Sequence, residues 1–441
     1  MTRQLTKNTL WGKLAHFFHT PLAGGVVLIF FTVVALVLSN LESTSEWYAA
    51  LWHTDFTIGL ENFSLSKPLE LWINDALMAV FFFSVGLEIK REIVAGELRS
   101  LSQASLPIAA AVGGMVVPAL IYFMFNDGLP SGSGWGIPMA TDIAFALGIL
   151  SMMGRRVPLS LKIFLTALAI VDDLGAILVI AIFYSSQLDW AMLIAAGVVF
   201  VLLVTMSKTK VYKMRWYIIP AIALWVLFLK SGIHATIAGV LIAMTMPTSA
   251  KYSKESFYAA SQKLVNKFKA SDVNRVQVLN NDKQREVLTQ LRDLSRNTMS
   301  PVQRLEHSLH SVVAFFIMPL FALCNAGVVI PADTISALAS EQSTGIIMGL
   351  VLGKPLGIMI FSLIVLKLGV AAMPSGANYR TLLGVSCLGG IGFTMSIFIN
   401  NLAFTDVELI STGKIAILVA SVLAAVLGAL MLSLASPKKK L

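Results

Sequence analysis

The sequence predicts an all-α, polytopic membrane protein with about twelve transmembrane helices. Of its 441 residues, 56% are hydrophobic and only 13% are charged, whereas soluble domains contain about 25% charged residues. The apolar residues are gathered in stretches long enough to cross a bilayer as helices. Polar or Gly/Pro-rich segments separate these stretches, so each stretch is expected to form one helix of a bundle.

Twelve apolar stretches of spanning length follow one another along the chain. The first comes after a positively charged segment, as in a signal peptide. Its apolar run is too long, and it lacks an obvious cleavage site with small residues, so we expect it to be retained as a helix. The expected spans are 22–38, 71–89, 104–125, 136–153, 159–184, 189–205, 216–230, 233–247, 309–329, 344–366, 380–400 and 410–434.

The distribution of positive charge predicts the orientation of the helices. With the N-terminus in the cytoplasm, all but four of the 33 Lys and Arg residues fall in segments on the inner side. The exceptions are Lys67, Lys230 and Lys414 on the outer side and Lys354 inside a span. Cytoplasmic loops carry an excess of Lys and Arg, so both termini are expected in the cytoplasm. The net charge of +9 therefore reflects topology and does not indicate a nucleic-acid partner.

Residues 248–308 are expected to form one long segment on the cytoplasmic side. The segment has mixed charge and little apolar surface, which favours a solvated linker over a regulatory element. Within it, residues 276–296 could form a surface helix. Cys324 and Cys387 fall inside apolar stretches, so we interpret them as small core residues rather than as a disulfide or metal pair.

Two adjacent aspartates, Asp172 and Asp173, interrupt the apolar stretch 159–184. An ionised carboxylate at the centre of a membrane helix costs about 2.5–3.5 kcal/mol on insertion scales, and ionisable residues at this depth usually belong to an ion or proton pathway. We therefore predict a proton or cation site; the alternative is a pair that only forms salt bridges inside the bundle. Successive helical residues point about 100° apart, so the two carboxylates cannot be equivalent.

Three further ionisable residues, Asp75, Asp142 and Lys354, fall well inside predicted spans. They must face one another or a water-filled cavity, because isolated charges are costly in hydrocarbon. Lys354 is the only cation among them and is therefore the expected partner of a carboxylate. The alternative is a lysine near an interface whose charge reaches water along its apolar stem.

Two of the predicted spans are interrupted near their middle. The interruptions are made by Pro138 in one span and by three glycines in the other, Gly389, Gly390 and Gly392. Gly/Pro-interrupted spans in the two halves of a chain point to the binding site of a transporter, although glycines also serve close helix packing. Broken helices expose partial charges at their inner ends. Asp142 is placed to offset positive N-termini, and Lys354 is placed to offset negative C-termini.

A site that holds either protons or a small cation on the same carboxylate oxygens exchanges one for the other by competition. We expect ligands from Asp172 and Asp173, and from Asp142, with the Thr141 hydroxyl, backbone carbonyls and water. An exchanger is therefore the predicted function. A sodium-coupled symporter of an organic substrate on a similar fold is the nearest alternative. An intramembrane aspartyl protease would use two acids but gives Lys354 no role, and its Gly-x-Gly-Asp motif is absent.

Four motifs carry a resemblance to a known family. They are ATDIAFALG at 140–148, AIVDDLGA at 169–176, GKPLG at 353–357 and GIGFTMSIF at 390–398. In this order they resemble the NhaA-type sodium/proton antiporters, and the similarity extends from about residue 14 to the end of the chain.

The resemblance implies a core of two inverted three-helix repeats, 104–184 and 344–434, in which two broken helices cross. It also implies a panel-like dimerisation domain, a homodimer and a bacterial inner-membrane location. Asp172 and Asp173 would exchange sodium or lithium for a larger number of protons, without a cofactor. Asp142 and Lys354 would balance the ends of the crossed helices.

The resemblance further implies regulation by pH, with activation at alkaline pH. The pH-response cluster of the family corresponds here to Glu88, Arg91, Glu92 and Glu306. His234 matches another pH-linked position, although a hydrogen-bonded packing role would equally explain it. The segment before Glu306 is much longer than in the familiar members of the family, which leaves the pH set point open.

Overall fold

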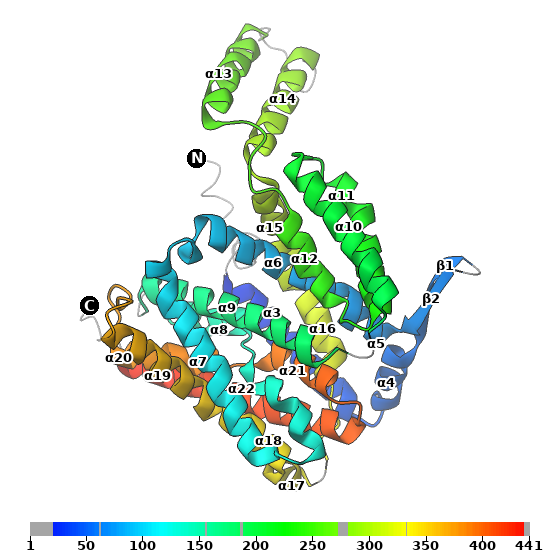
Figure 1. Ribbon diagram of the computed structural model, residues 1–441, viewed down its shortest axis with the longest axis vertical. Helices are drawn as coiled ribbons and strands as arrows, with labels where there is room; N and C mark the ends of the chain where they lie inside the picture. The colour runs from blue at the N-terminus through cyan, green and yellow to red at the C-terminus, as the bar shows by residue number, and fades with distance from the viewer. Residues whose placement is uncertain are drawn as a thin grey trace.

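The computed structural model describes residues 21–60, 63–154, 157–185, 188–271, 281–331 and 333–435. Within these residues the protein is a bundle of helices with one small β-hairpin (Figure 1). Eight helical spans are long and apolar enough to cross a membrane, and two bent helix pairs raise the number to as many as ten. The predicted class, an all-α polytopic membrane protein, is confirmed. The basic residues expected in 1–20 and 436–441, and Arg155 and Arg156, lie outside the described residues.

The long spans follow the predicted stretches closely. Three of them contain a π-helical turn, at Ile73–Leu77, Val313–Ile317 and Gly349–Gly353. The spans are α3 (Pro21–Asn40), α5–α6 (Leu69–Trp72 and Met78–Ala95), α7 (Leu101–Asn126), α9 (Leu159–Phe183), α10 (Trp190–Lys208), α15–α16 (Pro301–Val312 and Met318–Asn325), α18–α19 (Glu341–Met348 and Lys354–Lys367) and α22 (Val407–Ala435).

Two spans are bent at a break, as predicted from proline and glycine. A 3₁₀ helix over Pro130–Met139 is followed by α8 (Ile143–Met152) at an angle of 42°. Helix α20 (Tyr379–Gly389) is followed by α21 (Phe393–Ala403) at 44°. The 3₁₀ helix begins before the predicted start of this span, in a Gly/Ser-rich sequence that the hydropathy pattern does not mark as helical.

The stretches predicted at 216–230 and 233–247 form shorter helices, α11 (Arg215–Ser231) and α12 (Thr236–Thr245). Their 17 and 10 residues fall below the length of a spanning helix, so the count of twelve spans is not reached. Helix α11 lies beside α10 at one side of the bundle (Figure 1). Helix α12 packs closely on α6, because a Cβ at Gly239 would lie only 2.1 Å from the carbonyl oxygen of Ala79.

The segment between the first two spans, which we expect on the outer side, is ordered, and the sequence did not predict this. It contains α4 (Ser45–His53) and an antiparallel hairpin of β1 (Asp55–Leu60) and β2 (Phe63–Pro68). Lys67 on β2 places Nζ 2.8 Å from Asp75 Oδ2, and the Asp75 side chain is 22% exposed. Asp75 therefore lies near the N-terminal end of its span, whereas we had expected it well inside the span.

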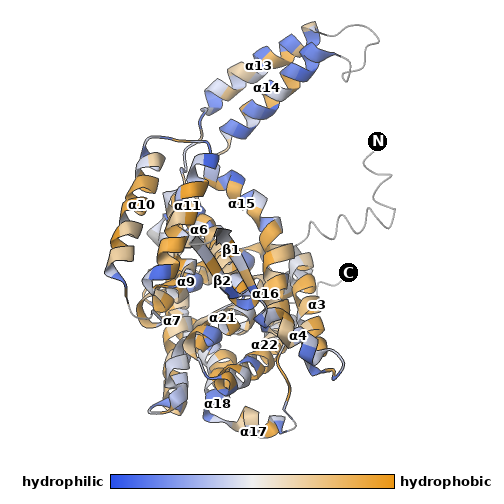
Figure 2. Ribbon diagram, turned by 90° about the vertical axis from the view of Figure 1, so that its right-hand side faces the viewer, coloured by the Kyte–Doolittle hydropathy of each residue, from blue (hydrophilic) through white to orange (hydrophobic). Residues whose placement is uncertain are grey.

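Residues 248–308 do not form the solvated linker that we favoured. Helices α13 (Lys254–Ala270) and α14 (Asp282–Thr298) pack against each other and project from the bundle (Figures 1 and 2). Helix α14 accounts for most of the surface helix predicted at 276–296, while 276–280 lie outside the described residues. The helices pair because each carries an apolar stripe, with Val287 fully buried in α14.

The structure also corrects the placement of Lys414. We expected this residue on the outer side, with Lys354 as the only cation at membrane depth. Helix α22 begins at Val407, so Lys414 lies two turns inside the helix, and it is only 8% exposed. The bundle therefore encloses a second lysine, which we had counted with the residues of the outer side although it falls within the predicted span 410–434.

Candidate ion-binding site

The two broken helices meet at their breaks, residues 140–142 and 390–392. The Asp142 backbone N–H donates to the carbonyl of Ile391 at 2.7 Å, and the Ser396 hydroxyl donates to the carbonyl of Ile137 at 2.8 Å. Each break therefore satisfies backbone groups of the other, as a non-helical segment inside a membrane requires. Gly390 permits a close approach of its break to the π-helical turn Gly349–Gly353, because a Cβ there would lie 2.3 Å from the carbonyl oxygen of Leu350.

Asp142 is buried between the N-termini of two half-helices. Its carboxylate accepts a hydrogen bond from the Phe145 N–H of α8 at 2.9 Å and from the Thr394 N–H of α21 at 3.2 Å. The Thr394 hydroxyl also donates to it. Helix N-termini carry partial positive charge, so one carboxylate offsets two of them. The role of Thr394 was not predicted, although the residue lies in a quoted motif.

Lys354 is fully buried and contacts both Asp172 and the C-terminal end of the 3₁₀ helix. Its Nζ lies 2.6 Å from Asp172 Oδ2 and donates to the carbonyl of Met139, the last residue of the 3₁₀ helix. A helix C-terminus carries partial negative charge, so the ammonium group offsets this end and a carboxylate together. The structure thus brings together the cation and the acid that the sequence suggested as partners.

The aspartate pair lies next to Lys354 and has unused hydrogen-bonding capacity. Thr141 Oγ1 lies 2.6 Å from Asp172 Oδ2 and 2.9 Å from the carbonyl oxygen of Gly389. Asp172 and Asp173 are 1% and 2% exposed. The Oδ1 atom of each is buried without a hydrogen-bond partner among the described residues. Unpaired buried acceptors are costly, so these two oxygens are suited to a proton or a small hard cation.

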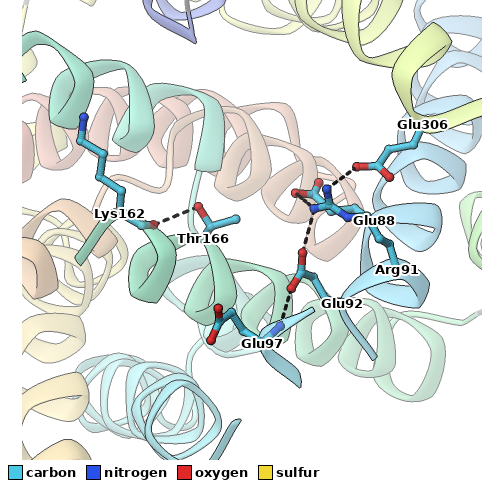
Figure 3. Close-up of polar contacts among 7 residues, drawn as sticks. All are labelled: Glu88, Arg91, Glu92, Glu97, Lys162, Thr166 and Glu306. Carbon is cyan, nitrogen blue, oxygen red and sulfur yellow. Dashed lines mark hydrogen bonds and ion pairs between the residues drawn. The ribbon is translucent and has the colours of Figure 1, made fainter. Parts of the chain in front are cut away.

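A cluster of charged residues lies between α6 and α15 (Figure 3). Arg91 contacts Glu92 at 2.8 Å, Glu306 at 3.2 Å and Glu88 at 3.9 Å. Glu92 also accepts a hydrogen bond from the Glu97 N–H at 2.9 Å. The four residues assigned to pH response by resemblance are therefore in contact, with Arg91 at their centre.

A cavity of about 430 Å³ extends from this cluster to α9. Lys162 and Thr166 of α9 line it together with Arg91 and Glu92. Thr166 precedes Asp173 by seven residues, which is about two helical turns, so both side chains lie on the same side of α9. The cavity therefore lies on the same side of α9 as Asp173, about two helical turns away, and neither aspartate is among the residues that line it. Sequence reasoning missed Lys162 and Thr166, because neither interrupts an apolar stretch at its centre.

His234 does not belong to the charged cluster. Its Nε2 atom lies 2.7 Å from the carbonyl oxygen of Tyr184, directly after the end of α9. The Tyr184 hydroxyl donates to the carbonyl of Ser133 at 2.8 Å and accepts from the Gly136 N–H at 3.2 Å. His234 is thus linked to the 3₁₀ helix at the end of α9 opposite the cavity.

Comparison with known proteins decides the family. The family model described as Na+/H+ antiporter 1 matches residues 15–432. The chain belongs to this family. A relative named Na(+)/H(+) antiporter NhaA 2 from Syntrophotalea carbinolica is 46% identical over 425 residues, which cover 96% of each chain. The NhaA antiporter of Oleidesulfovibrio alaskensis is 47% identical over 94% of this chain and 92% of its own. That of Escherichia coli is 44% identical over 94% and 96%.

Membership of the Na+/H+ antiporter family confirms the resemblance drawn from the four motifs. The protein is a secondary transporter and not an enzyme. Transporters of this family exchange sodium or lithium for protons and need no cofactor. Among the described residues, no group of three His, Cys, Asp or Glu side chains is arranged to hold a resident metal ion.

Proposed function

We propose that the protein exchanges sodium or lithium for protons at Asp172 and Asp173. The observation that carries the proposal is the pair of buried Oδ1 atoms that lack a hydrogen-bond partner among the described residues. A sodium ion coordinated by both carboxylates, the Thr141 hydroxyl, backbone carbonyls and water would satisfy them. Protons bound to the same oxygens would do so in the sodium-free state, so that the two substrates compete.

Lys354 and Asp142 act in this proposal as fixed counter-charges. Lys354 keeps its contact with Asp172 Oδ2 at 2.6 Å. This contact is an ion pair while the carboxylate is ionised, and a hydrogen bond to its carbonyl oxygen after Oδ1 takes up a proton. Asp142 stays with the helix N-termini and takes no part in exchange unless the crossing rearranges. The exchange is electrogenic in this proposal, because two carboxylates take up more protons than the single charge of sodium replaces.

Alternating access would move the crossed helices relative to the rest of the bundle. The inverted repeats 104–184 and 344–434 would supply the moving core, with the pairs bent by 42° and 44° as matched halves. The cavity beside Lys162 and Thr166 would be the cytoplasmic entrance. We further propose cytoplasmic termini, a homodimer and an inner-membrane location, supported by the charge distribution and by the family.

The charged cluster of Glu88, Arg91, Glu92 and Glu306 is proposed to adjust transport to pH. It lies at the mouth of the cavity, and protonation of any of its three carboxylates would weaken the contacts to Arg91. His234 would act at the opposite end of α9, through the carbonyl of Tyr184. Neither group contacts the aspartate pair directly through a described hydrogen bond.

Proteoliposomes with an internal pH dye test the proposed function. An outward or inward sodium gradient should change the luminal pH with no other solute present, and reversing the gradient should reverse the sign. A sodium-coupled symporter would leave the luminal pH unchanged both with and without its organic substrate. Potassium gradients of the same size, with the membrane potential clamped, serve as the control.

A further inference from the structure

The hairpin of α13 and α14 is a well-packed element. Asn281 accepts a hydrogen bond from the Gln284 N–H at 3.2 Å and donates to the carbonyl of Ser271 at 2.7 Å, which ties the two helix ends together. Gln284 and Val287 are buried against α13. The sides of the hairpin are therefore fixed surfaces whose residues can be assigned from helix geometry.

The two helices of the hairpin meet along a buried seam, which includes Leu264 on α13 and Gln284 and Val287 on α14. One side of the hairpin can be identified from the residues that directly follow the seam residues in sequence. Successive residues of a helix are rotated by about 100°. In an antiparallel pair, the residue directly after a seam residue therefore points to the same side of the pair on both helices. Val265 follows the seam residue Leu264 on α13, and Leu288 follows Val287 on α14. Residues one or two turns away on each helix extend this side.

This side, here called the basic face, combines positive charge with exposed apolar residues. Tyr258 is 69% exposed, and Val265 and Leu288 are each 45% exposed. The other charged members of this face are exposed and basic, Lys254 and Lys269 on α13 and Arg285, Arg292 and Arg296 on α14, while Gln262 and Ser295 on the same face are exposed and uncharged.

Acidic residues are confined to the edges of the basic face. Asp282 lies 3.3 Å from Arg285, and Asp293 lies 3.8 Å from Arg292. The opposite side of the hairpin carries Lys263, Lys267 and Lys283, together with Glu286, and lacks large exposed apolar residues among those described. The hairpin is thus polarised across its width, with charge and apolar surface combined on one side only.

We propose that the basic face binds the anionic phospholipid headgroups of the cytoplasmic leaflet. Clusters of Lys and Arg just outside a membrane span attract anionic lipid, and apolar side chains among them insert at the headgroup level. The hairpin is covalently tethered beside that surface, so the local concentration of headgroups is high. Figure 2 shows that the hairpin is inclined to the axes of α10 and α11 and does not continue in their direction. The inference rests on the proposed cytoplasmic orientation.

The connection at the base of the hairpin links this surface to the charged cluster. The carbonyl of Asn297 accepts hydrogen bonds from the N–H groups of Lys251 and Tyr252 at 3.0 and 3.4 Å, which closes the base. Ser300 then caps α15, and Glu306 in the second turn of that helix contacts Arg91 at 3.2 Å. Docking of the hairpin is therefore mechanically connected to the mouth of the cavity through one short helix.

The full-length protein in nanodiscs tests the proposal. A Val265→Cys variant carries an environment-sensitive fluorophore at the basic face; Cys324 and Cys387 are buried. We expect a blue shift in discs that contain phosphatidylglycerol and none in discs of phosphatidylcholine alone. High potassium chloride should abolish the shift, because salt screens surface charge.

Matched charge neutralisations on the two sides of the hairpin provide the control. Arg285→Gln with Arg292→Gln should lower the docked-to-free ratio about thirtyfold, at about 1 kcal/mol for each charge near an anionic surface. Lys263→Gln with Lys267→Gln on the opposite side should leave most of the shift. Equal losses from both double variants would overturn the proposal.

Two further outcomes also overturn it. One is the same emission in both kinds of disc. The other is a shift in phosphatidylcholine discs on addition of duplex oligonucleotide without a response to phosphatidylglycerol, which would assign the basic face to nucleic acid. Sodium-driven proton flux measured on the same preparations reports on antiport separately. A failure of lipid docking and a failure of the proposed function are therefore distinguishable.

Discussion

Lys354→Ala removes the cation that contacts the buried carboxylate of Asp172 at 2.6 Å. It also removes the donor to the carbonyl of Met139. Breaking a buried ion pair by deleting one partner costs about 3–5 kcal/mol, because the other charge stays buried without compensation. We expect the purified variant to melt well below the wild type in detergent. The difference in melting temperature between the variant and the wild type should grow with rising pH. Protonation of the unpaired Asp172 carboxyl removes the cost of its buried charge only at low pH.

Two comparisons isolate the contribution of burial. Combining Lys354→Ala with Asp172→Asn removes both charges, so most of the lost stability should return. Lys67→Ala breaks a pair of similar length, 2.8 Å, whose side chains are 27% and 22% exposed, and should cost at most about 1 kcal/mol. A wild-type melting temperature for Lys354→Ala would refute the reasoning. So would a double variant no more stable than Lys354→Ala alone.

Three further substitutions test the surroundings of the site. Gly390→Ala should abolish most sodium-driven flux, because its methyl group would lie 2.3 Å from a carbonyl oxygen, whereas Gly197→Ala, with nothing within 4 Å, should not; equal activity would contradict the close approach. Thr394→Val should lower the melting temperature by removing a hydrogen bond to Asp142 worth about 1.5–3 kcal/mol, and Thr394→Ser should restore it. Glu306→Gln should change the maximal rate at low pH even at saturating sodium; a rate that sodium fully restores in both proteins would mean simple competition.

The sequence predicted those features of the site that are energetically conspicuous in a membrane. Ionised residues at the centre of an apolar stretch are costly, so Asp142, Asp172, Asp173 and Lys354 could be singled out without any structure. Pro138 marks a break for a similar local reason, since it removes a backbone donor. The ion pair of Lys354 with Asp172 followed from the need to pair buried charges. Asp142 instead accepts hydrogen bonds from two helix N-termini where the broken helices cross.

Other features depended on information that a single local pattern does not contain. Lys414 lies close to the end of its apolar stretch, where hydropathy cannot distinguish a loop from two buried helical turns. Thr394 is neutral, so its place beside Asp142 becomes visible only when two distant segments meet. The hairpin of α13 and α14 was taken for a linker because its mean composition is polar. The mean composition hides the apolar stripe on each helix, which includes Leu264 on α13 and Val287 on α14.

Sodium-induced proton release tests the central claim, that cation and protons compete for Asp172 and Asp173. Sodium chloride is added to the purified protein in a weakly buffered detergent solution near the middle of its active pH range, and the change in pH is recorded. We expect the wild type to release protons, and Asp75→Asn as well, because Asp75 lies near the N-terminal end of its span and contacts Lys67. Asp172→Asn with Asp173→Asn should release none, and potassium chloride should have no effect on any variant. Wild-type release from the double aspartate variant would contradict the account.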